Sequence, residues 1–109
     1  MATNTFTRYV AKNVGTTPVV LVTAASSTQT TVIGLTAANT TTAPITVDAY
    51  VTASSVNYYV VKGATVPVGS SLALFGADGK IVLNTGDAFT VVASSATSAD
   101  VILSCLQIS

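Results

Sequence analysis

The sequence has no histidine and no glutamate, and only 7% of its 109 residues are charged. Without histidine it lacks the commonest general base and metal ligand, which excludes every Ser-His or Cys-His nucleophile arrangement. The acidic residues are aspartates, mostly at expected turns or strand starts, where a carboxylate stabilises the local backbone: Asp48, Asp78, Asp87 and Asp100. We therefore expect a non-enzymatic protein with no metal and no other cofactor.

Positive charge is equally scarce, and it is spread along the chain. Arg8, Lys12, Lys62 and Lys80 bring the net charge to zero and form no basic stripe that could meet phosphates. No apolar run approaches the roughly 20 residues of a membrane helix. The first residues, MATNTFTRYVAKNV, lack a basic segment followed by an apolar core, which predicts synthesis in the cytoplasm without an export signal. We expect neither nucleic acid nor a membrane as a partner.

A single cysteine, Cys105, excludes an intrachain disulfide. It lies in the apolar stretch DVILSCLQI, and we expect it to be a small buried side chain.

Hydroxyls and small apolar side chains take the place of the missing charges. The chain has nineteen threonines and eleven serines, half of its residues are apolar, and its mean hydropathy is +0.67. An ordinary soluble domain has about 25% charged residues, which keep its copies apart. We infer that much of the surface contacts other protein, copies of the same chain above all.

The pattern of residues predicts one all-β domain over residues 1–109. Short runs rich in Val, Ile, Thr and Tyr alternate with Gly, Pro, Asn and Asp about every ten residues, and no segment has a sustained 3.6-residue period. This predicts an antiparallel β-sandwich of about eight to nine short strands, immunoglobulin-like or jelly-roll-like. The expected strands are 5–14, 18–23, 29–38, 44–52, 57–62, 71–75, 80–83, 88–94 and 100–108.

Three turns are expected to close hairpins. In ADGK, residues 77–80, the Asp-Gly pair suits a two-residue turn. The second turn is NTGD at 84–87, where Gly86 can take a positive φ. The third is ASSVN at 53–57, which joins the strands on either side of it. The prolines should lie at strand starts or in a connection, where a missing N–H breaks no ladder: Pro18, Pro44 and Pro67.

The last strand has no polar face. Val101, Leu103 and Cys105 alternate with the apolar set Ile102, Leu106 and Ile108. Either the strand is central, with a loop over its second face, or Ile102, Leu106 and Ile108 dock on a neighbouring subunit.

The N-terminal segment 1–14 mixes charged and apolar residues on one face. Alternation places Arg8 and Lys12 with Phe6, Val10 and Val14. Two interpretations stay open: an edge strand whose charges deter uncontrolled pairing, or an arm that contacts an adjacent subunit.

Tyrosines supply the one argument for a ligand. Tyr50, Tyr58 and Tyr59 fall on two strands that we pair, so Tyr50 could lie beside one of the others as a platform for a sugar or a partner. Because the chain has no tryptophan, we favour packing or subunit contact over sugar binding as the role of these tyrosines.

Several stretches resemble a group of small β-sandwich virion proteins of tailed bacteriophages, including phages of cyanobacteria. The resemblance spans most of the chain and rests on GLTAANT, VKGATVPVGSSL, IVLNTGD and SCLQI, at 34–40, 61–72, 81–87 and 104–108. These motifs set turns and core positions. Asn84-Thr85, where an acidic residue often stands, and Cys105 depart from the group's pattern.

The resemblance implies a virion structural protein. We expect a capsid decoration (cement) protein that forms homo-oligomers and contacts the major capsid protein. The alternative is a neck, tail or baseplate adaptor that contacts neck or tail proteins, and a carbohydrate- or receptor-binding module is a third hypothesis.

Overall fold

The computed structural model describes residues 4–73 and 80–108, and within them it is all-β, as predicted. The prolines also take their expected places, just before a strand or in a connection. Nine strands follow one another along the chain: β1 (Asn4–Val14), β2 (Val19–Thr23), β3 (Gln29–Asn39), β4 (Ile45–Ala53), β5 (Val56–Val66), β6 (Ser71–Ala73), β7 (Ile81–Leu83), β8 (Ala88–Ala93) and β9 (Ala99–Ile108).

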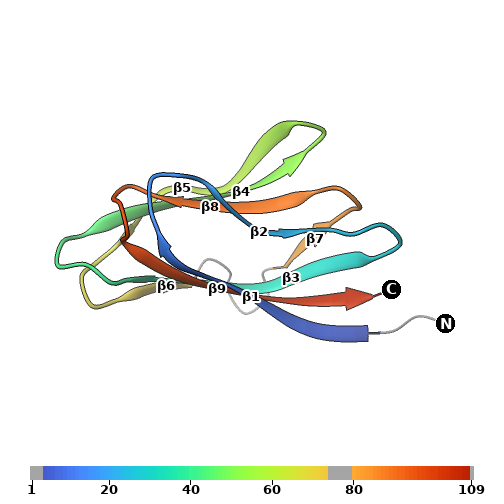
Figure 1. Cartoon of the computed structure of the whole chain (residues 1–109), viewed down its shortest axis with the longest axis horizontal. Helices are drawn as coiled ribbons and strands as arrows, with labels where there is room; N and C mark the ends of the chain where they lie inside the picture. Colours follow the sequence, from blue (N-terminus) through green and yellow to red (C-terminus); the bar gives the residue numbers. More distant parts are fainter. Residues whose placement is uncertain (1–3, 74–79, 109) are drawn as a thin grey trace.

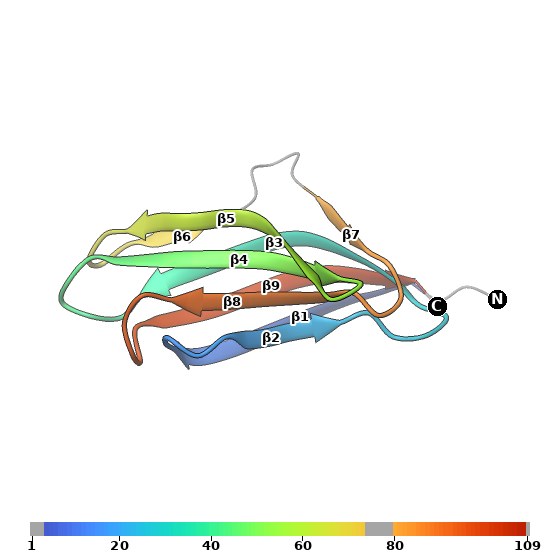
Figure 2. The same ribbon diagram turned by 90° about the horizontal axis from the view of Figure 1, so that it is seen from above.

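The strands form two antiparallel sheets that pack face to face as a sandwich. Sheet A has the order β1-β9-β3-β6, with β7 also paired to β3, and sheet B has the order β2-β8-β4-β5. Figure 1 shows these two layers one above the other, and Figure 2 shows the strands running along the long axis. The start of β1 lies beside the end of β9, where Asn4 is paired with Ile108.

The core lies between the sheets, and β3 and β9 contribute alternate residues to it. Phe89 from sheet B and Leu103 from sheet A are fully buried there. Most of the other members are valines and alanines, which suit closely packed sheets. On β9, the set Val101, Leu103 and Cys105 that alternation put on one face is buried in this core.

Two of the three expected hairpins are wrong. β6 and β7 both pair antiparallel with β3, at its two ends, so they run the same way and form no hairpin with each other. The Asp78-Gly79 turn itself lies outside the described residues. At 84–87 the turn is present, with Gly86 at φ 90, but it carries the chain from β7 in sheet A to β8 in sheet B.

The third hairpin is confirmed, and its turn has an unusual composition. β4 pairs with β5 up to Ala53 and Val56, so Ser54 and Ser55 form a two-residue loop. Both have positive φ, 51 and 65 respectively, as a type I′ turn requires.

β5 runs further than expected, to Val66, because Gly63 forms a bulge instead of ending the strand. Two residues of β5, Lys62 and Gly63, stand opposite Asp48 of β4. Gly63 has φ 68, and its N–H donates to Asp48 Oδ1 at 2.6 Å. Glycine is needed here because the left-handed backbone strains residues with a Cβ.

Candidate functional site

The outer face of sheet A carries most of the residues singled out from the sequence. Phe6, Arg8, Val10 and Lys12 share one face of β1, as predicted, and that face is turned away from the core. Phe6 is 77% exposed and Val10 58% exposed. A phenylalanine exposed to this degree on a regular strand marks a surface that another molecule can cover.

β9 is the central strand next to β1, and its second apolar set faces outward on the same side. Ile102 is 50% exposed, whereas Leu106 and Ile108 are half-buried. In the register with β1, Leu106 stands opposite Phe6 and Ile102 opposite Val10. The apolar residues of the two strands therefore adjoin one another across the sheet.

Val14 departs from the expected face. The pairing with β9 shifts between Ala11 and Val14, and Asn13 has φ 58, so the bulge turns Val14 inward, where it is 2% exposed. Residues 4–14 are otherwise paired with β9 as an edge strand, and this part of the segment does not extend away from the sheet as an arm.

Asp100 holds this bulge in place. Its Oδ1 accepts the Asn13 N–H at 3.0 Å, and its Oδ2 lies 3.4 Å from Lys12 Nζ. The hydrogen bond from the Asn13 backbone lowers the pKa of Asp100, and the charge of Lys12 lowers it further. Arg8 makes no ion pair or hydrogen bond with any residue in the described ranges.

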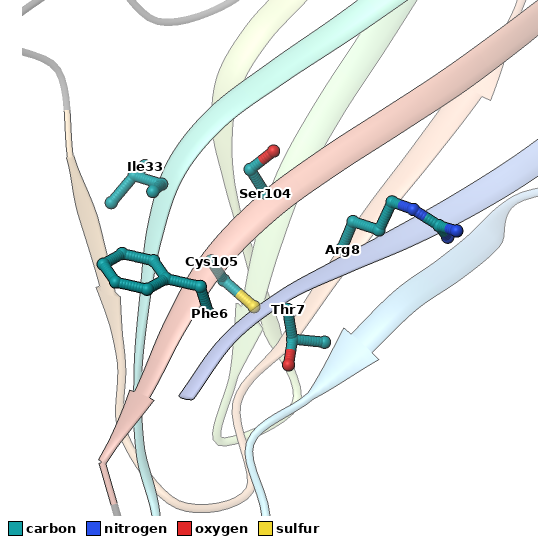
Figure 3. A pocket seen from close by; sticks show the side chains of 6 residues that line it. All are labelled: Phe6, Thr7, Arg8, Ile33, Ser104 and Cys105. Atoms are coloured by element: carbon teal, nitrogen blue, oxygen red, sulfur yellow. The ribbon is translucent and has the colours of Figure 1, made fainter. Parts of the chain in front are cut away.

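A shallow hollow of about 380 Å³ lies on this face, and sequence analysis did not anticipate it. Phe6 and Arg8 of β1, Ser104 of β9 and Ile33 of β3 line it, together with Thr7 and Cys105. Figure 3 shows the ring of Phe6 pointing toward Ile33 and the guanidinium of Arg8 pointing away from both.

The hollow owes its shape to a bulge in β3. Between Val32 and Gly34 the register with β9 shifts by one residue, which leaves Ile33 as the extra residue, 38% exposed. A Cβ added at Gly34 would have no atom within 4 Å. The signal in the sequence was the pair Ile33-Gly34 inside a strand, since an isolated glycine there often marks a bulge.

The tyrosines are only partly brought together. Tyr50 and Tyr59 are paired across β4 and β5, with ring centroids 5.0 Å apart, whereas Tyr58 pairs with Val51. Tyr50 is 8% exposed, and Lys62 Nζ lies 4.5 Å from the centroid of Tyr59. Tyr59 is 47% exposed and Tyr58 59% exposed, so the covered Tyr50 does not join them in one exposed platform.

Cys105 is buried, as expected, with 1% exposure. Burial raises the pKa of its thiol. The described residues contain no group of three or more acidic, histidine or cysteine side chains that could hold a metal ion. Within the same residues, no helix is long and apolar enough to cross a membrane.

No protein-family model and no curated protein matches the chain. A similar solved structure comes from work on Bacillus endospore appendages described as disulfide-linked pili, with a TM-score of 0.53 and 16% identity. The match covers 98% of this chain and 85% of that one. At this identity the likeness concerns the fold.

Proposed function

We propose that this protein is a non-enzymatic structural protein of a tailed-bacteriophage virion, and that it acts as a capsid decoration protein through contacts with its own copies and with the major capsid protein. The observation that carries the proposal is the outer face of sheet A. It presents Phe6, Val10 and Ile102 to the surroundings, in a chain with very few charges.

The chemistry of this face supports assembly. The charged residues found on it are Arg8, Lys12 and Asp100, and the last two already pair with each other. Covering such a face removes apolar area from water, worth about 25 cal/mol per Å², while few ions are desolvated. The similar fold of a pilus protein fits a self-assembling role, and the virion setting rests on the sequence motifs.

The test is the copy number of the chain in particles purified from the source of its gene. Quantitative mass spectrometry should find it at an abundance close to that of the major capsid protein, and cryo-electron microscopy should place it on the shell. A far lower abundance would support the alternative, a neck, tail or baseplate adaptor. Absence from the particles would refute both proposals.

A further inference from the structure

We propose that the outer face of sheet A binds a second copy of this chain, with Phe6 of each copy packed against Ile33 of the other across a two-fold axis that runs along β9. This deepens the proposed function, and rests on it, by naming the surface used for self-contact.

The face carries a knob and a hollow side by side. Among the described residues Phe6 is the most exposed of the large apolar side chains, and the hollow next to it extends to Ile33. A two-fold interface needs such a self-complementary surface, because each residue must meet its counterpart from the other copy. Phe6 and Ile33 stand on strands that flank β9, so a two-fold axis along β9 exchanges their positions.

Gly34 gives independent support. It has no positive φ, and there is open space where its side chain would be, so neither backbone conformation nor crowding inside one copy requires glycine. A glycine inside a strand weakens the sheet, and besides marking a bulge, as it does here, it is often found where a ligand or another backbone approaches closely. A second copy that seats Phe6 in the hollow would make this approach.

Charge and area favour a second copy as the occupant. Lys12 is paired with Asp100, and Arg8, which lines the hollow without an ion pair, points its guanidinium away from Phe6 and Ile33 in Figure 3, so the contact between Phe6 and Ile33 is itself apolar. At the usual strand spacing and rise, β1, β9 and β3 present a footprint on the order of 500 Å². Two such footprints together fall in the range of the small interfaces, under about 1,200 Å² in total, that weak complexes use.

The experiment measures the mass of the purified chain by analytical ultracentrifugation over a dilution series in the micromolar range. The unmodified chain should be a dimer or a larger even-numbered oligomer. Phe6→Asp should make it a monomer, with the thermal unfolding midpoint that the unmodified chain has when diluted until it is monomeric. Val20→Asp is the matched control, because Val20 is 56% exposed on the outer face of sheet B, and it should leave the mass unchanged.

Gly34→Val is a second variant, which should stabilise the monomer but weaken the association of two copies. It should raise the urea midpoint of the monomer, because valine suits a strand, and should weaken association at least tenfold by placing a side chain where the second copy approaches. Ser104→Cys, next to the proposed axis, should cross-link to itself under oxidation, whereas Val20→Cys should not.

A purified chain that stays monomeric, or equal effects of Phe6→Asp and Val20→Asp, would overturn the proposal. If Phe6→Asp abolished attachment to phage particles without changing the mass of the free chain, a different protein would be the occupant. The proposed function would then survive while the dimer failed.

Discussion

Asn39 and Val66 join the two sheets of the sandwich: Nδ2 of Asn39, at the end of β3, donates to the carbonyl oxygen of Val66, at the end of β5, at 3.0 Å. The same amide donates to the Ala43 carbonyl, and its Oδ1 accepts the N–H and the hydroxyl of Thr41. Asn39 is only 7% exposed, so it organises the connection from sheet A to sheet B from inside.

Asn39→Ala should therefore be strongly destabilising. It removes four hydrogen bonds and leaves the buried Val66 carbonyl without this donor, which should cost about 3 kcal/mol of unfolding free energy. Urea denaturation followed by circular dichroism measures the loss. Asn57→Ala is the control, since Asn57 is exposed and should change stability by less than about 0.5 kcal/mol. Equal effects would contradict the assigned role.

Asp100 should make stability depend on pH at the acid end. Its folded pKa lies below the ordinary value of 3.8, so its contribution is complete above that value and is lost as the pH falls through the lowered pKa. Asp100→Asn should be less stable than the unmodified chain at neutral pH, and the difference should shrink below about pH 4.

Urea midpoints of the two chains from neutral to strongly acidic pH test this expectation. Lys12→Gln is the matched control. Its effect should be smaller, because the Asn13 N–H is the main cause of the lowered pKa and the ion pair with Lys12 is exposed. A difference that persists unchanged in strong acid would rule out the assigned contribution of Asp100.

The strand positions could be predicted from the sequence, and the way the strands pair could not. Alternation is a local property, so the inward residues of β9, such as Leu103, were assigned correctly. Pairing depends on contacts between distant residues. For that reason the sequence predicted that β6 and β7 form a hairpin, although each of them pairs with β3 instead.

In the candidate site, too, local alternation could be predicted from the sequence, whereas features that depend on pairing could not. The outward residues of β1 and β9 followed from alternation, but Val14 was misplaced because a bulge resets the period. The hollow could not be predicted, since it depends on the pairing that places Phe6 and Ile33 on either side of β9.

Cys105 should not react with thiol reagents in the folded chain. The thiol is buried and its pKa is raised, so both access and the thiolate form are disfavoured. We expect labelling by Ellman's reagent to begin only at the denaturant concentration where the chain unfolds. Val20→Cys should label at once, and reductant should leave any oligomer of the unmodified chain intact. Rapid native labelling of Cys105 would contradict its burial.

The Ser54-Ser55 turn should be open to stabilisation. Both residues hold a positive φ, which is unfavourable for serine and favourable for asparagine followed by glycine. The double variant Ser54→Asn, Ser55→Gly should gain about 1 kcal/mol in unfolding free energy. The same pair placed at Thr16-Thr17, where neither φ is positive, is the control and should give no such gain. A loss of stability at Ser54-Ser55 would show that the turn differs from type I′.

Thr30 gives the last prediction, because its side chain is in an unfavourable environment. Thr30 is fully buried on β3. Its Oγ1 is the one buried side-chain polar atom among the described residues that has no hydrogen-bond partner. Valine has nearly the same shape without the hydroxyl, so Thr30→Val should raise the unfolding free energy by about 1 kcal/mol. Thr36→Val, on the exposed face of the same strand, controls for the general preference of valine for strands. Thermal unfolding of both variants measures the difference, and a destabilised Thr30→Val would mean that the hydroxyl is bonded after all.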